Sequence, residues 1–205
     1  MPDIEDKYLT INKPAKGFFK DRNSKFISLA YSVANEDEIK EIQKKIRKEY
    51  HDARHHCFAW KLGMDNNNYR VNDDGEPNNS AGQPILGQIL SNNLTNVLII
   101  VVRYFGGTKL GIPGLINAYK TSAADAINNA DIIEKYICDI YSFGFTYENL
   151  NTVMKLIKDN DLQIIKQEFD LDCKIELSVK KSKTEKILYK FELIKDIKAT
   201  YLKTL

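Results

Sequence analysis

The amino-acid sequence predicts an α+β protein of two domains, residues 1–133 and 134–205. Three observations lead to this prediction. The length of 205 residues suits one large domain or two small ones. Hydrophobic residues make up 43% of the chain and charged residues 28%, a mixture typical of a folded protein with a hydrophobic core. Segments with the two-residue period of strands alternate with segments of helical period in both parts.

The first domain is expected to mix strands and helices along its whole length. Strands are expected near residues 7–11, 25–33, 57–62 and 96–105, and helices near 36–49, 81–90 and 113–129. Ile39, Ile42 and Ile46 give the first helix one apolar face. The strand at 96–105 is rich in β-branched residues, which favours a central place in a sheet. Pro113 suits the first turn of the last helix, where its missing N–H is not needed.

The second domain follows the order βαββαβ, which predicts a ferredoxin-like fold. Strands are expected at 141–145, 163–169, 173–179 and 197–201, with apolar helix stripes at Leu150, Val153, Met154 and Ile157 and at Ile187, Leu188, Phe191 and Ile194. The sequence Ser182-Lys183-Thr184-Glu185 is typical of a capping box that starts the second helix.

Charge and cysteine usage point to an ordinary intracellular protein. The formal net charge is +2, and neither domain has the basic excess of a strong nucleic-acid binder. Cys57, Cys138 and Cys173 have no metal-type spacing, so we expect free thiols in a reducing cytoplasm. The N-terminus shows no signal peptide, and the longest apolar run, 97–102, is too short to cross a membrane.

The three histidines of the chain gather at His51, His55 and His56. Such a cluster can bind a metal or move protons near neutral pH. However, His55 and His56 lead into a strand, where neighbouring side chains point to opposite faces, and the spacing matches no zinc pattern. The favoured interpretation is therefore a buried histidine that braces a loop beside an exposed one, with no metal.

Asp73, Asp74 and Glu76 place three carboxylates in four residues. They suit a Mg²⁺ site or acid–base chemistry, although the calcium-loop pattern is absent. The alternative is a solvated turn in which Ser80 or Asn79 caps the next helix. The residues alone favour neither interpretation.

A glycine-rich segment, residues 102–115, runs from the central strand into a helix N-terminus. Free N–H groups and the positive end of a helix favour anions at such a place. Gly106 and Gly111 have the spacing of a P-loop, but Ile112 stands where its lysine should be. The alternative is that the glycines only permit a tight turn. The candidate anion- or RNA-binding residues are Arg54, Arg70, Arg103, Gly106, Gly107, Thr108, Lys109 and Gly111.

Four segments together resemble the YigZ/IMPACT family in order and spacing: His56–Trp60, Asn72–Pro77, Ala81–Leu86 and Arg103–Gly111. The resemblance covers about residues 15–130, and the tail resembles the second domain of bacterial members. It implies a first domain with the fold of the second domain of a small-subunit ribosomal protein, shared with domain IV of elongation factor G. It also implies a tail similar to domain V of that factor.

The resemblance implies a protein linked to translation. Eukaryotic relatives regulate translation under amino-acid stress through an additional N-terminal domain, and this chain begins too close to its first strand to include it. The family offers no catalytic residues to transfer. The leading hypothesis is a binding module for RNA, the ribosome or a translation factor, without a cofactor. The alternatives are a metal-assisted hydrolase or transferase acting on a phosphorylated small molecule, and a protein-interaction scaffold.

Overall fold

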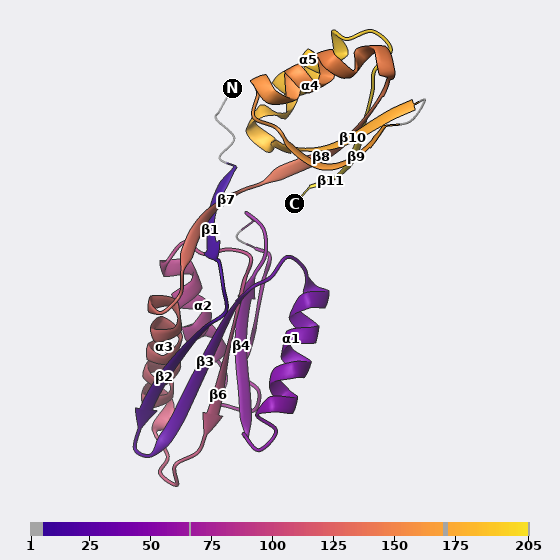
Figure 1. The fold of residues 1–205 in the computed structure, drawn as a ribbon. Helices are drawn as coiled ribbons and strands as arrows, with labels where there is room; N and C mark the ends of the chain where they lie inside the picture. Colours follow the sequence, from indigo (N-terminus) through magenta and orange to yellow (C-terminus); the bar gives the residue numbers. More distant parts are fainter. Residues whose placement is uncertain (1–5, 66, 170–171, 205) are drawn as a thin grey trace. The chain divides into compact units, whose positions relative to one another are not determined.

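The computed structural model describes residues 6–65, 67–169 and 172–204 (Figure 1). The chain divides into two compact units. The N-terminal unit is formed by Tyr8–Lys135, and the C-terminal unit is formed by the residues before and after that range. Each unit mixes helices with antiparallel strands, so the predicted α+β class is confirmed. Within the described residues, no helix is long and apolar enough to cross a membrane.

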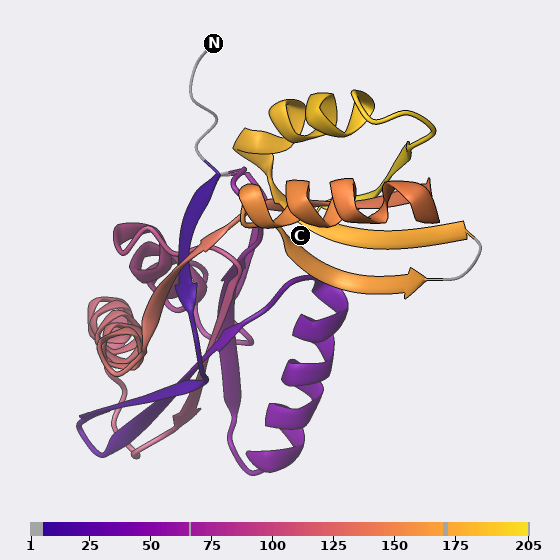
Figure 2. The ribbon, with the colours of Figure 1, turned by 45° about the horizontal axis from the view of Figure 1, so that its top comes forward.

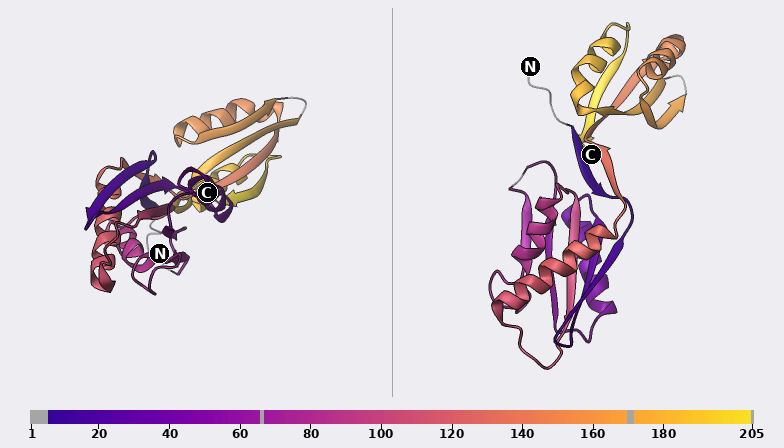
Figure 3. Two further views of the ribbon diagram at one scale, coloured as in Figure 1. Left: turned by 90° about the horizontal axis from the view of Figure 1, so that it is seen from below. Right: turned by 90° about the vertical axis from the view of Figure 1, so that its left-hand side faces the viewer.

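A five-stranded sheet forms the centre of the N-terminal unit. Its order is β2 (Ala15–Asp21), β3 (Ser24–Ser32), β6 (Val97–Tyr104), β4 (His55–Lys61) and β5 (Tyr69–Asn72), with every neighbouring pair antiparallel. Helix α1 (Glu36–Glu49) covers one face, and α2 (Gly82–Ser91) and α3 (Gly111–Asn128) cover the other (Figures 1 and 3). The central position predicted for the β-branched strand is thus found in β6.

The alternating side chains of β6 build two cores. Val97, Ile99 and Val101 pack with the helices α2 and α3, whereas Leu98, Ile100 and Val102 pack with α1. Because successive residues of a strand point to opposite faces, a strand covered on both sides must be apolar throughout. This double burial explains the continuous apolar run in the sequence.

Three strands were not expected from the sequence. β2 and β5 are edge strands of the five-stranded sheet, and β7 (Ile132–Tyr136) pairs with β1 (Lys7–Ile11) in a separate two-stranded sheet. β2 contains Gly17 and charged residues, and most side chains of β7 are exposed. Edge strands bury fewer apolar side chains than central strands, so their sequences give a weak signal.

The C-terminal unit has the predicted order βαββαβ. The elements are β8 (Cys138–Thr146), α4 (Leu150–Asp159), β9 (Gln163–Phe169), β10 (Asp172–Lys180), α5 (Thr184–Glu192) and β11 (Lys198–Thr204), with 3₁₀ turns at Tyr147–Asn149 and Lys181–Lys183. The antiparallel sheet has the order β11-β8-β10-β9. Both helices lie on one face (Figure 2), and Phe143 of β8 stacks on Phe191 of α5 with ring centroids 4.0 Å apart.

The predicted capping box at the start of α5 is wrong. Residues Lys181–Lys183 form a 3₁₀ turn, and α5 begins only at Thr184 without a side-chain cap from Lys183. The Ser182 backbone N–H instead donates to Asp6 Oδ2 at 3.0 Å, as does its hydroxyl. Thr184 Oγ1 donates to Asp139 Oδ2 at 3.0 Å. The hydroxyls of Ser182 and Thr184 therefore bond to carboxylates far away in the sequence and do not cap α5.

Candidate functional site

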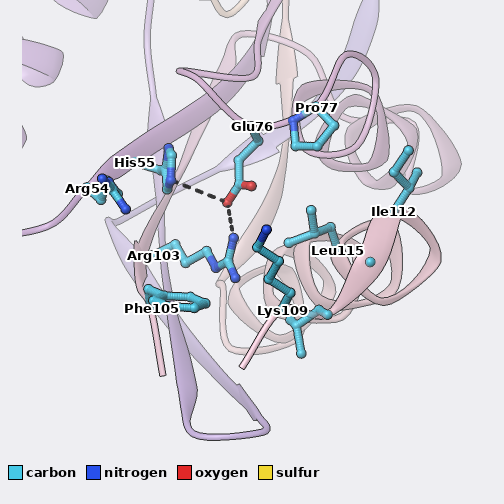
Figure 4. A pocket seen from close by; sticks show the side chains of 11 residues that line it. Arg54, His55, Glu76, Pro77, Arg103, Phe105, Lys109, Ile112 and Leu115 are labelled. Carbon is cyan, nitrogen blue, oxygen red and sulfur yellow. Dashed lines mark hydrogen bonds and ion pairs between the residues drawn. The ribbon is translucent and has the colours of Figure 1, made fainter. Parts of the chain in front are cut away.

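A pocket of about 420 Å³ lies in the N-terminal unit, where the end of β6 meets the start of β4 and the N-terminus of α3 (Figure 4). Its lining residues are Arg54, His55, Glu76, Pro77, Arg103, Phe105, Lys109, Leu110, Gly111, Ile112 and Leu115. Most of the wall is apolar, and the polar groups converge from separate parts of the chain. This composition is typical of ligand sites in proteins.

The N-terminus of α3 forms one side of the pocket. The helix begins at Gly111, whose φ of +71° is accessible to glycine at little strain. Leu110, the residue before it, has no side chain that could cap the helix. The free N–H groups of the first turn and the helix dipole therefore give this wall a positive potential. Arg54 and Lys109 are exposed beside it and add two cations.

Gly106 has a packing role outside the pocket. Its N–H donates to Ser24 Oγ at 3.1 Å. A Cβ at this position would lie 2.1 Å from the backbone carbon of Asn23, in the turn between β2 and β3. Only glycine fits this close approach. Gly107, with a φ of +86°, and the exposed Thr108 also lie outside the pocket lining.

A buried ion pair forms the floor of the pocket. Arg103 Nη1 donates to Glu76 Oε1 at 2.5 Å, and the two side chains are 6% and 4% exposed. Tyr119 donates its hydroxyl to the same oxygen at 2.9 Å. The Arg103 guanidinium also lies 5.6 Å from the ring centroid of Phe105. Arg103, expected to meet a ligand phosphate, is thus already neutralised by Glu76.

Cys57 and Tyr119 extend this network into the core. The Cys57 thiol lies 3.3 Å from the Tyr119 hydroxyl and 3.0 Å from the Asp73 carbonyl. Burial is the main cause that raises the pKa of both the Cys57 thiol and the Tyr119 hydroxyl above their ordinary values. Both groups are therefore protonated at neutral pH, and Cys57 is a packed core residue, as the sequence predicts.

His55 and His56 point to opposite faces of β4, as predicted. His55 lines the pocket, donates from Nδ1 to the Asp74 carbonyl at 2.8 Å, and has Nε2 at 3.9 Å from Glu76 Oε1. His56 is buried on the other face, with Nε2 3.1 Å from the Tyr50 carbonyl. Burial, followed by the nearby positive charge of Arg47, lowers the pKa of His56 below its ordinary value of 6.5.

Asp73 caps helix α2, a role that one of the two interpretations of this segment gave to Ser80 or Asn79. Its Oδ1 accepts the N–H groups of Ala81 at 3.0 Å and Gly82 at 2.8 Å, and its Oδ2 accepts that of Asn79 at 2.9 Å. Ser80 instead donates its hydroxyl to the Pro77 carbonyl. The Asp73 carboxylate can bond to all three N–H groups because its two oxygens accept several donors at once. The alternative of a capped turn therefore named the wrong residue for the cap.

Asp74 ties the acidic segment to β4 and α1. It accepts the His56 N–H at 2.6 Å and the Arg47 guanidinium at 2.7 Å. Burial opposes ionisation of Asp74, but these two hydrogen bonds and the nearby positive charge of Arg47 act together to lower the pKa of its carboxyl below 3.8. Each of the three carboxylates of the segment thus bonds to a different set of groups. Among the described residues, no group of three or more His, Cys, Asp or Glu side chains is arranged to hold a metal ion.

The structure brings together six of the residues singled out in the sequence. The pocket contains Arg54, His55, Glu76, Arg103, Lys109 and Gly111, whereas Arg70, Gly106, Gly107, Thr108, His56, Asp73 and Asp74 lie outside its lining. Arg70 is exposed on the edge strand β5, opposite Trp60. The apolar wall was missed, although Phe105 and Ile112, 47% and 54% exposed, flank the glycine-rich turn. Large exposed apolar residues beside such a turn are the signal that could have revealed it.

These features define a two-unit α+β protein whose first unit carries a partly cationic pocket. Residues 22–127 match the Impact N-terminal domain, a range that contains every residue of the pocket lining. The chain is 31% identical over 150 residues to the IMPACT family member YigZ of Escherichia coli (strain K12), covering 72% of this chain and 74% of that protein. The chain belongs to the IMPACT family.

Two further comparisons cover more of the chain. The IMPACT family member YvyE of Bacillus subtilis (strain 168) is 29% identical over 177 residues, which is 86% of this chain and 82% of that protein. A crystal structure described as that of a hypothetical protein has a TM-score of 0.74 at 25% identity and covers 98% of this chain and 99% of its own. Both the family inferred from four short segments and the fold class are thus confirmed.

Proposed function

We propose that the protein is a cytoplasmic, translation-linked RNA-binding module, and that the pocket beside α3 receives a nucleotide unit of RNA. One observation carries the proposal. Two exposed cations, Arg54 and Lys109, stand at the uncapped N-terminus of a long helix, with the exposed ring of Phe105 beside them. These are the groups that a phosphate and an unstacked base require.

The phosphate would bind at the helix end. Backbone N–H groups at a helix N-terminus favour an anion, and the flanking cations add charge-assisted hydrogen bonds. Glu76 does not oppose this because its charge is balanced by Arg103 at 2.5 Å. The net positive potential of the pocket therefore comes from Arg54, Lys109 and the helix.

The base would use the apolar wall. Single-stranded RNA is recognised chiefly through bases that stack on aromatic or apolar side chains. Phe105 is 47% exposed and Ile112 is 54% exposed at the pocket, so both present apolar surface to a ligand. A volume of about 420 Å³ lies in the range of small-molecule sites and suits one nucleotide rather than a duplex.

The link to translation rests on the family and on the resemblance of both domains to domains of translation proteins. Fold likeness alone does not fix function, so the pocket and the ribosome must be tested together. Two exposed cations at the pocket suit a small number of phosphate contacts. We therefore expect binding that is local and moderately sensitive to salt.

The test is co-sedimentation of the full chain with ribosomes across a salt series. The Arg54→Ala/Lys109→Ala variant should lower the affinity by about tenfold, because it removes two exposed phosphate donors. The matched control is Lys44→Ala/Lys48→Ala, which removes the same charge from exposed positions on α1. Equal losses in both variants would contradict the assignment to the pocket. No binding by the unmodified protein at low salt would contradict the proposed function.

Arg103→Ala is unsuitable for this test. It would leave the buried Glu76 carboxylate without its ion-pair partner, and breaking a buried pair in this way costs about 3–5 kcal/mol of stability. A loss of binding would then report unfolding instead of recognition.

A further inference from the structure

We infer that Glu76 makes this pocket selective for guanine, a specificity that rests on the function proposed above. The carboxylate is the hydrogen-bond acceptor placed at the pocket floor, and its surroundings fix its orientation. Guanine is the RNA base that presents two adjacent N–H donors, N1–H and the N2 amino group, to one acceptor. Which base fits depends on which oxygen of the Glu76 carboxylate already accepts hydrogen bonds.

The two oxygens of Glu76 differ in their partners. Oε1 accepts hydrogen bonds from Arg103 Nη1 at 2.5 Å and from the Tyr119 hydroxyl at 2.9 Å. Oε2 accepts no hydrogen bond from any described residue, and Figure 4 shows it turned away from Arg103 toward the side of Pro77. Two donors to Oε1 hold the side chain in one rotamer, so Oε2 is a fixed acceptor.

A fixed acceptor discriminates among the four bases. A carboxylate accepts N–H donors and repels carbonyl oxygens, because its oxygens carry only lone pairs and negative charge. Guanine offers N1–H and N2–H₂ side by side. Uracil offers one N–H between two carbonyls, so Oε2 would face like partial charges. Adenine and cytosine each offer one amino group beside a ring-nitrogen acceptor, and they should fall between these limits.

Neighbouring groups fit the rest of a guanosine monophosphate. Arg54, Lys109 and the N–H groups of α3 remain for the phosphate. A base without the matching N–H donors would leave the buried Glu76 Oε2 unpaired, and this energetic cost discriminates against that base.

The test uses nucleotide analogues, which do not perturb the fold. The full chain is titrated by calorimetry with GMP, IMP, AMP and UMP. IMP lacks only the N2 amino group of GMP, so it should bind about tenfold more weakly, the loss of one hydrogen bond to a charged group. UMP should bind most weakly. Equal affinities for GMP and IMP, or a preference for UMP, would overturn the inference.

A variant supplies a second, independent readout. In Glu76→Gln, the amide oxygen should face the donors Arg103 and Tyr119, which turns the new NH₂ group toward the pocket. The variant should therefore lose the preference for GMP and gain one for UMP, with the melting temperature measured alongside. If it unfolds, the comparison of GMP with IMP still decides.

The outcomes separate the inference from the proposed function. Equal binding of all four nucleotides, weakened by Arg54→Ala/Lys109→Ala, would reject guanine selection and leave the RNA-binding pocket intact. No binding of any nucleotide, together with no ribosome binding, would reject both. Ribosome binding without binding of any of the four nucleotides would reject guanine selection in this pocket.

Discussion

The Asp73 side chain holds a stretch of backbone that lies six to nine residues further along the chain. Its two oxygens accept three N–H groups, from Asn79, Ala81 and Gly82, and so close the loop that leads into α2. Helix N-termini leave N–H groups unsatisfied, and a carboxylate there also interacts favourably with the helix dipole. The loop so closed carries Glu76 and Pro77 into the pocket.

We expect Asp73→Ala to destabilise the N-terminal unit by about 2 kcal/mol, the upper end of the effect of losing a helix cap. Urea denaturation followed by the fluorescence of Trp60, the single tryptophan, measures it. Asp65→Ala is the control, because Asp65 accepts one exposed hydrogen bond, from Asn67 in its own turn. Equal effects of the two substitutions would contradict the capping role.

His56 should make the stability of the N-terminal unit depend on pH. Its pKa is lowered in the folded state by burial and by Arg47, although Asp74 acts in the opposite direction. In the unfolded chain, the His56 side chain therefore binds a proton near pH 6.5, whereas in the folded chain it binds that proton only at a lower pH. Stability should fall as the pH is lowered from 7.5 to 5, a range in which Asp74 stays ionised because its pKa lies below 3.8.

The measurement is urea denaturation at pH 7.5 and pH 5 for the unmodified chain, His56→Gln and His51→Gln. His56→Gln should reduce the pH dependence, because its amide does not titrate in this range. His51 is exposed, so His51→Gln should leave the dependence unchanged. A pH dependence unaffected by His56→Gln would assign it to another group.

The sequence indicated which residues belong to the site, but not which of their side chains bond to each other. The sequence singled out Arg103 and Glu76, and both line the pocket. However, the residues are 27 positions apart, and their pairing at 2.5 Å depends on how the acidic loop folds over β6. Local chemistry therefore assigned Arg103 to a ligand, whereas the folded chain uses it to neutralise Glu76. Of the cations that line the pocket, Arg54 and Lys109 stay exposed.

At the scale of elements, the turn between β6 and α3 is fixed by close packing. Gly106 lies against the turn that joins β2 to β3, at a distance that excludes a side chain. Gly111 then allows α3 to start with a positive φ. The glycines of the motif thus determine where the helix N-terminus faces, even though only Gly111 lines the pocket.

Gly106→Ala should destabilise the protein by at least about 1–3 kcal/mol, because a Cβ 2.1 Å from the Asn23 backbone forces the turn to move. Gly87→Ala on the exposed face of α2 is the matched control. A Cβ there meets nothing within 4 Å, so this change should stabilise the protein by about 0.5–1 kcal/mol. Thermal unfolding by circular dichroism measures both. A neutral Gly106→Ala would contradict the close packing.

The sequence predicts the buried elements better than the exposed ones. The buried β6 and the amphipathic α1 were located because their side-chain periods reflect burial. The strand at Gln163–Phe169 has the predicted bounds even though most of its side chains are exposed. β2 and β5 were missed because they are edge strands with few buried side chains. β7 was missed because its partner, β1, lies far away in the sequence. A local window carries no information about such partners.

At the scale of the whole molecule, the two units have separate cores. The N-terminal unit packs its apolar residues on both faces of one sheet, whereas the C-terminal unit packs Phe143, Ile175, Phe191 and their neighbours under two helices. Trp60 belongs to the core beneath α1. Its fluorescence therefore reports on the N-terminal unit.

Phe143→Ala should destabilise the C-terminal unit by about 3–5 kcal/mol, because it removes a fully buried ring that stacks on Phe191. The far-ultraviolet circular dichroism signal should then show an early unfolding step that the Trp60 fluorescence does not follow. Tyr189→Ala is the control, since its ring is 62% exposed on the same helix as Phe191. A parallel shift of both signals would contradict separate unfolding of the cores.

The pocket at the start of α3 is proposed to bind RNA through Arg54 and Lys109. The most direct test is the affinity for a short single-stranded RNA, measured by fluorescence anisotropy at several salt concentrations. If each cation meets one phosphate, the slope of log K against log salt should become shallower by about 1.4 in the double alanine variant, at about 0.7 per contact. An unchanged slope and affinity in that variant would place RNA binding elsewhere and contradict the claim.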